Sequence, residues 1–151
     1  MEITSEIERH LAGPGAPCAC SVVRRTGRAL TRRYDEILAP SGLRVTQYAV
    51  LSTLARQGGE DGMSRLADEL ATDRTTLTRA LSPLQRDGLI RVALGQGRLS
   101  RVVELTAAGE AALEQARPLW LDAQAELATI VGPDRLAALV GELAAVETLL
   151  R

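Results

Sequence analysis

Leucine residues recur at the three- and four-residue spacing of an α-helix along most of this chain, and only residues 89–105 break that pattern. Within residues 71–92, ATDRTTLTRALSPLQRDGLIRV, the residues Leu77, Leu81 and Leu84 fall on one side of a helix, while hydroxyl and guanidinium groups cover the other side. Residues 89–105 then change to a β-branched-rich pattern around the turn sequence GQGR. The chain is therefore expected to be mainly helical with one small β-hairpin.

The composition supports a single helical core. The chain has 151 residues, of which 46% are hydrophobic and 25% charged, as in an ordinary globular domain. There is no Phe, and Tyr34, Tyr48 and Trp120 are the only aromatic residues. We therefore expect a core built from Leu, Val, Ile and Ala.

Helix-breaking and helix-capping residues indicate where the elements begin and end. Gly and Pro in AGPGAP end the first 17 residues, and a helix is expected over about residues 18–39. Ser64 is expected to cap a short helix in MSRLADELA, a tight turn follows at residues 71–72, and QGGEDG is expected to be a loop. Thr106 is expected to cap a long helix that Pro118 kinks, and a last helix covers residues 134–150.

Charge is distributed unevenly along the chain. All 18 basic residues are Arg, and residues 24–101 hold 14 of them with eight acidic residues. Residues 102–151 hold three Arg and eight acidic residues. A basic middle segment indicates a surface that meets a polyanion, although such runs also occur on plain solvated faces.

Two short helices, a tight turn and a Gly-tipped hairpin in that order are typical of a winged helix-turn-helix, whose second helix enters the DNA major groove. Arg binds guanine edges, while Thr and Ser meet phosphates, bases or the thymine methyl group. A phosphate is also expected at the N-terminus of the second helix. The candidate residues for binding double-stranded DNA are Ser64, Arg74, Thr75, Thr76, Thr78, Arg79 and Arg98.

Two other classes of function remain as alternatives. A winged-helix protein-interaction module that no longer binds DNA specifically would keep the fold, but its second helix would be expected to lose Arg or gain acidic residues. An enzyme is not expected, because there is no nucleophile–base–acid set, no Gly-rich phosphate loop and a single His near the N-terminus. No cofactor is expected.

The segments VTQYAVLSTL, SRLADELATDRTTLTRALSPLQRDGLI and LTAAGEAAL, in this order, resemble the MarR family of bacterial transcription regulators over about residues 20–150. The resemblance implies a homodimer whose first and last helices interdigitate and whose two lobes bind a palindromic operator. It also implies control, as a repressor, by a small, often aromatic, anionic ligand or by an oxidant. The leucine stripe of the C-terminal helices independently fits dimerisation, because a small lobe cannot cover it.

The resulting domain prediction has four parts. Residues 1–17 form a flexible N-terminal segment, residues 18–40 a dimerisation helix, residues 41–106 the winged helix-turn-helix lobe, and residues 107–151 the C-terminal dimerisation helices. With neither a secretory signal nor an apolar stretch of membrane-spanning length, a cytoplasmic protein without a membrane partner is expected.

The sequence departs from the family pattern in the wing and in the second helix. The family usually has an acidic residue just before its minor-groove arginine, whereas Gly97 precedes Arg98 here. Without that carboxylate, Arg98 is less firmly oriented. Pro83 lies within the second helix and is expected to kink it after Arg79.

Cys18 and Cys20 are candidates for a redox site. Cys20 aligns with the reactive cysteine of the organic hydroperoxide resistance branch, but Arg24 and Val45 replace two of that branch's tyrosines and only Tyr34 is kept. A helix N-terminus and Arg24 both favour a thiolate. A zinc or copper site with His10, or burial of small residues at a dimer interface, are the alternatives.

A small-molecule inducer would need a pocket between the dimerisation helices and the lobe. Arg24 or Arg28 is placed to hold a carboxylate there, and Tyr48 and Trp120 to line the pocket. A lone Trp is more often part of a core, so both interpretations stay open.

Overall fold

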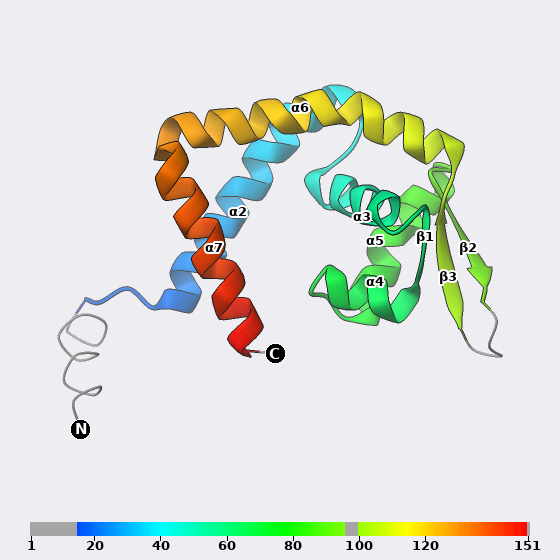
Figure 1. Ribbon diagram of the computed structural model, residues 1–151, viewed down its shortest axis with the longest axis horizontal. Helices are drawn as coiled ribbons and strands as arrows, with labels where there is room; N and C mark the ends of the chain where they lie inside the picture. The colour runs from blue at the N-terminus through cyan, green and yellow to red at the C-terminus, as the bar shows by residue number, and fades with distance from the viewer. Residues whose placement is uncertain (1–14, 96–99, 151) are drawn as a thin grey trace. The chain divides into compact units, whose positions relative to one another are not determined.

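The computed structural model describes residues 15–95 and 100–150 (Figure 1). The chain divides into two compact units, Met1–Arg33 and Tyr34–Arg151, so the boundary falls within the first described helix. The elements follow the sequence as α2 (Ala19–Leu38), the 3₁₀ helix η1 (Ala39–Ser41), α3 (Val45–Arg56), β1 (Glu60–Gly62), α4 (Met63–Glu69), α5 (Arg74–Arg86), β2 (Ile90–Leu94), β3 (Arg101–Leu105), α6 (Ala107–Val131) and α7 (Pro133–Leu150). The expected mainly helical fold with a small β wing is confirmed.

The core of the second unit is aliphatic, as its composition predicts. Tyr48 is its one buried aromatic residue among the described residues, with Trp120 packed against it at the edge. Burying these side chains is the main source of stability for the unit, since each removes a large apolar area from water. The largest fully buried side chains are Leu38, Leu51, Leu54, Leu66, Leu77, Leu81, Leu84, Ile90 and Val103.

Helices α4 and α5 form the predicted helix-turn-helix. The turn between them bends at Ala71, whose φ of 48° lies in the left-handed region that Ala rarely adopts. The Thr72 N–H donates to the Ala67 carbonyl at 3.0 Å, which closes the end of α4. Leu66 on α4 and Leu77 on α5 are both fully buried, and this shared burial holds the two helices together.

The capping prediction for α4 is wrong. Gly62 in an extended conformation is the N-cap, and Ser64 is the second residue of the helix. Ser64 is exposed there. The helix starts earlier than expected because Met63 turns inward and joins the core.

The wing contains one more strand than the sequence predicts. β2 and β3 pair antiparallel, with Val92 opposite Val103, and β1 pairs with the other edge of β3, with Asp61 opposite Val103. Part of the QGGEDG segment, expected to be a loop, is therefore a short strand. The tip of the hairpin, residues 96–99, lies outside the described residues.

Helix α6 is anchored to the wing at its first turn. Thr106 is the N-cap, as predicted, and its hydroxyl oxygen accepts from the Gly109 N–H at 3.0 Å. The same hydroxyl donates to the Gly88 carbonyl at 2.7 Å, and the Thr106 N–H donates to the Leu89 carbonyl. A Cβ on Gly109 would lie 2.1 Å from that carbonyl oxygen, so only glycine permits this approach. α6 then continues through Pro118 as one assigned helix.

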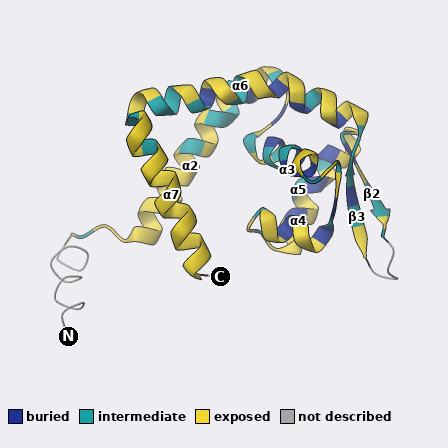
Figure 2. Ribbon diagram, in the orientation of Figure 1, coloured by how far each residue is buried: buried dark blue, intermediate teal, exposed yellow. Residues whose placement is uncertain are grey.

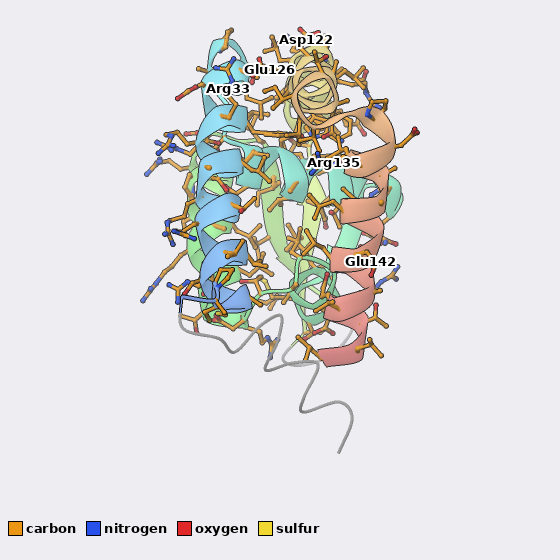
Figure 3. All side chains as sticks on the ribbon, turned by 90° about the vertical axis from the view of Figure 1, so that its left-hand side faces the viewer. Arg33, Asp122, Glu126, Arg135 and Glu142 are labelled. Carbon is orange, nitrogen blue, oxygen red and sulfur yellow. The ribbon has the colours of Figure 1, made fainter. Side chains whose placement is uncertain are left out.

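Helix α7 buries none of its residues (Figure 2). Its stripe is apolar all the same, and Leu136 is its one half-buried member. Arg135 and Glu142 lie along one edge of the stripe, seven residues apart (Figure 3). The exposed members of the stripe and of the helix end are Leu139, Val140, Leu143, Val146, Leu149 and Leu150.

Candidate nucleic-acid interface

The exposed face of α5 carries the groups that the sequence assigned to it. Its apolar face is fully engaged, with Leu77, Leu81 and Leu84 at most 2% exposed. The polar residues from the start of α5 to Ser82 point away from that face and are exposed. They are Arg74, Thr75, Thr76, Thr78, Arg79 and Ser82. The structure thus brings five of the seven predicted DNA-binding residues together on one helix.

The N-terminus of α5 is closed by its own carboxylate. Asp73 is the N-cap, and its side chain accepts from the Thr76 N–H at 2.8 Å and from the Thr76 hydroxyl at 2.6 Å. These hydrogen bonds lower the pKa of Asp73 below its ordinary value. Asp73 thus places a negative charge at the helix end where a phosphate is expected, and the phosphate contact stays a prediction.

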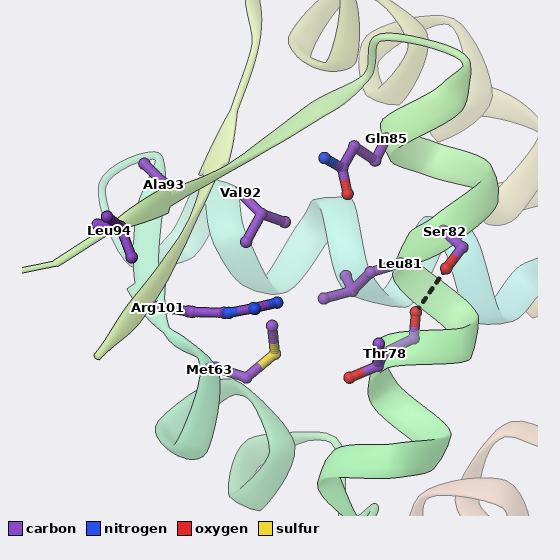
Figure 4. A pocket seen from close by; sticks show the side chains of 9 residues that line it. All are labelled: Met63, Thr78, Leu81, Ser82, Gln85, Val92, Ala93, Leu94 and Arg101. Atoms are coloured by element: carbon purple, nitrogen blue, oxygen red, sulfur yellow. Dashed lines mark hydrogen bonds between the residues drawn. The ribbon is translucent and has the colours of Figure 1, made fainter. Parts of the chain in front are cut away.

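The two hydroxyl groups nearest the wing are bonded to the helix itself. The Thr78 hydroxyl donates to the Arg74 carbonyl at 2.7 Å. The Ser82 hydroxyl donates to the Thr78 carbonyl at 2.9 Å, which is the dashed line in Figure 4. Both side chains are exposed. Their protons therefore stay within the helix while their oxygen atoms remain accessible.

A cavity of about 300 Å³ separates α5 from the wing (Figure 4). Thr78, Ser82 and Gln85 line it from α5, and Arg101 extends into it from β3. Arg101 is not among the DNA-binding residues predicted from the sequence. The two-residue alternation of a strand could have identified it, because it places Arg101 on the same face of β3 as the buried Val103.

Two of the predicted DNA-binding residues lie apart from α5. Ser64 is exposed in the first turn of α4. Arg98 lies outside the described residues. Within the described part of the wing, Arg91 and Glu104 form an ion pair across β2 and β3. That ion pair links the two strands on their exposed side.

Both cysteines are exposed at the start of α2. Cys18 directly precedes the helix, and its carbonyl accepts from the Val22 N–H at 3.0 Å. Hydrogen bonds from the backbone and hydroxyl of Ser21 lower the pKa of the Cys18 thiol. Cys18 thus joins Cys20, to which the family resemblance points, as a candidate for the reactive thiol.

The other sensing candidates differ in burial. Arg24 is exposed on α2. The Tyr34 hydroxyl donates to the Gln124 side-chain oxygen of α6, and partial burial raises its pKa. The rings of Tyr48 and Trp120 stack, with centroids 5.6 Å apart and planes 14° apart. Tyr48 and Trp120 therefore contribute to the core between α3 and α6.

The described residues offer neither a metal site nor a membrane-spanning helix. Residues 15–95 and 100–150 contain no cluster of three or more side chains of the types that hold a metal ion. None of the described helices has the combination of length and apolar sequence needed to cross a membrane. His10, considered as a partner of the cysteines in a metal site, lies outside the described residues.

Helix-turn-helix, polar second helix and β wing together define a winged helix-turn-helix DNA-binding protein. Solved structures extend this assignment. MosR from M. tuberculosis, crystallised in complex with DNA, is 41% identical and matches with a TM-score of 0.78 over 89% of this chain and 99% of its own. The chain belongs to the MarR family of transcription regulators.

Other family members match at lower identity. A MarR mutant from E. coli, complexed with operator DNA, is 26% identical over 83% of this chain and 91% of its own, with a TM-score of 0.74. AbsC from Streptomyces coelicolor, at 22% identity, covers 92% of this chain and 96% of its own with a TM-score of 0.77, and shows the shared fold. Neither the scan against family models nor the search of curated proteins gave a match.

Family membership decides among the classes of function that the sequence left open. The protein is a DNA-binding transcription regulator and not an enzyme. The protein-interaction module is disfavoured for a second reason, because α5 keeps Arg74 and Arg79 exposed. Acidic residues flank this helix only at Asp73 and Asp87, its two caps.

Proposed function

We propose that this regulator is a cytoplasmic homodimer that represses transcription by binding a palindromic operator with its two α5 helices. The observation that carries the proposal is the exposed polar face of α5, with an apolar face that the lobe itself covers completely. In this arrangement Arg79 and Arg74 read base edges, while Ser64 and Arg98 contact the backbone and the minor groove. The two half-sites then lie about one helical turn apart, ~34 Å.

The uncovered apolar side of α7 supports the dimer. A lone chain that exposes Leu139, Val140, Leu143 and Val146 on one helix would be prone to association. A symmetric pair covers both copies of the stripe at once. The predicted division into a lobe at residues 41–106 and dimerisation helices on either side of it follows from this proposal.

Release from the operator is triggered either by cysteine oxidation or by a small aromatic, anionic ligand. Exposure of both cysteines and the lowered pKa of the Cys18 thiol support oxidation. Arg24, exposed on α2, is the candidate partner for a carboxylate. Related structures carry ligands of the second kind, such as NadR in complex with 4-hydroxyphenylacetate at 20% identity.

Fluorescence anisotropy on the protein's own upstream intergenic DNA tests the function. Tight binding that weakens steeply with salt is expected for the operator, with much weaker binding to random DNA. A mild organic peroxide should abolish binding, and a thiol reductant should restore it, if the cysteines are the sensor. Cys18→Ser should then remove the response, while Cys20→Ser tests the alternative residue. Equal affinity for operator and random DNA at both salt concentrations would refute the proposal.

A further inference from the structure

The hydroxyl groups on the wing side of α5 form an ordered series. Thr78 donates its proton to the Arg74 carbonyl. Ser82, one turn further on, donates its proton to the Thr78 carbonyl, the hydrogen bond drawn in Figure 4. We call these two residues the hydroxyl pair. Both are exposed, and both line the cavity between α5 and the wing. The pair is thus held in one orientation on a surface that remains open.

This orientation fixes which hydrogen-bonding role each oxygen has toward the outside. A hydroxyl group has one proton and two acceptor lone pairs. With the proton donated to a helix carbonyl, the oxygen that remains exposed can only accept. The Thr76 hydroxyl, which donates to Asp73 at 2.6 Å, has the same restriction on the opposite flank of the helix.

We propose that the hydroxyl pair reads exocyclic amino groups in the major groove, namely N6 of adenine or N4 of cytosine. This inference rests on the proposed function. In the major groove these amino groups are the donors, whereas guanine presents N7 and O6 and thymine presents O4, all of them acceptors. An oxygen that can only accept matches a donor, so the positions of the half-site that face Thr78 and Ser82 carry adenine or cytosine on the contacted strand.

The same geometry separates the pair from the arginines of the helix. Guanidinium groups have donors and no acceptor, so Arg74 and Arg79 suit guanine edges and phosphates. A phosphate contact by Thr78 or Ser82 would require the hydroxyl to release its helix carbonyl, because phosphate oxygens accept. One helix thereby carries both kinds of readout, with donors on the arginines and acceptors on the hydroxyl pair.

Selection from a randomised duplex DNA library by the full-length protein tests the inference. The wild type is compared with Thr78→Val, which keeps the shape and the methyl group, and with Thr78→Ser, which keeps the oxygen. Thr129→Val is the matched control, because the hydroxyl of this exposed α6 residue donates to the Ala125 carbonyl at 2.9 Å in the same way. Thermal unfolding of each variant establishes that it is folded.

At one position of each half-site, Thr78→Val should lose about five- to tenfold of the preference for adenine or cytosine, the loss expected for one hydrogen bond. Thr78→Ser and Thr129→Val should keep the preference. Replacing that base by an analogue without its exocyclic amino group should weaken wild-type binding by the same factor and leave Thr78→Val unaffected.

Three results overturn the inference while the proposed function stands. They are a uniform loss of affinity for all sequences in Thr78→Val, no change in Thr78→Val, and a lost preference that was for guanine or thymine. The first indicates a phosphate contact, the second no contact, and the third a hydroxyl that donates. If the wild type itself enriches no motif, the proposed function fails and the inference fails with it.

Discussion

Helices α5 and α7 both carry a stripe of aliphatic residues, but the stripe is buried on α5 and exposed on α7. On α5 the stripe is at most 2% exposed, covered by α4, the wing and α3. On α7 the corresponding residues Leu143 and Val140 are 43% and 58% exposed. The role of α5 can thus be argued from one chain, because its free face is polar, whereas the role of α7 rests on the proposed dimer.

The largest expected effect comes from a charge placed in the exposed apolar stripe of α7. Leu143→Glu places a charge in the middle of the stripe and should convert the dimer to a monomer, measured by analytical ultracentrifugation. Because two linked half-site contacts bind far more tightly than one, operator affinity should fall by about 10²-fold or more. Ala145→Glu, on the opposite side of the helix, should change neither. A monomeric wild type, or a Leu143→Glu protein that stays dimeric, would refute the dimer interface.

Next come two glycines that differ in what surrounds them. Gly109→Ala forces a methyl group against the Leu89 carbonyl and should lower the free energy of unfolding by about 1–3 kcal/mol. Gly141→Ala, in the middle of α7 with nothing within 4 Å, should raise it by about 0.5–1 kcal/mol. Urea unfolding measures both. Similar effects at the two positions would contradict the contrast between a packed lobe and an open helix.

The substitution Arg79→Ala tests whether the polar face of α5 reads bases. Loss of a guanidinium from a base edge should reduce the preference for operator over random DNA by about tenfold or more and leave folding unchanged. Anisotropy titrations on both DNAs measure the ratio. An equal loss on both would show that Arg79 contacts the backbone and reads no base.

The smallest effect concerns the cap of α5. Asp73→Ala removes the acceptor of the Thr76 N–H and should lower the melting temperature at neutral pH. Because the folded protein lowers the pKa of Asp73, the stabilisation is present above about pH 3.9, the unfolded value, and is lost as the pH falls through the folded pKa. The gap between wild type and variant should therefore close in acid. Asp73→Asn, a cap that does not titrate, should keep its stability relative to Asp73→Ala.

Much of the lobe could be predicted, because its signals are local. Leucine spacing defined α5, the Thr106 cap defined the start of α6, and β-branched residues defined β2 and β3. β1 could not be found this way, since Asp61 is polar and still buried, and the strand exists through its long-range pairing with β3. The N-cap of α4 is the extended backbone of Gly62, and a glycine has no capping side chain that would mark the position in the sequence.

The sensing residues were harder to rank. The family resemblance favoured Cys20, whereas the lowered pKa of the Cys18 thiol arises from hydrogen bonds with Ser21 that depend on where the helix starts. Trp120 was left open between core and pocket, and its stacking on Tyr48 requires two helices far apart in sequence. Such contacts follow from tertiary packing.

The junction at Gly109 also has a mechanical consequence. The hydrogen bonds from Thr106 to Gly88 and Leu89 fasten the first turn of α6 to the end of α5 and the start of β2. Helix α6 has 25 residues and spans about 37 Å, so a tilt of about 5° at this junction displaces its far end by about 3 Å. We expect a displacement where α7 begins to reach the turn between α5 and β2 only if the stacking of Trp120 on Tyr48 also yields, because that contact holds α6 against α3. The Gly109 contact and the Tyr48–Trp120 stack are thus the two points at which α6 is fastened to the lobe.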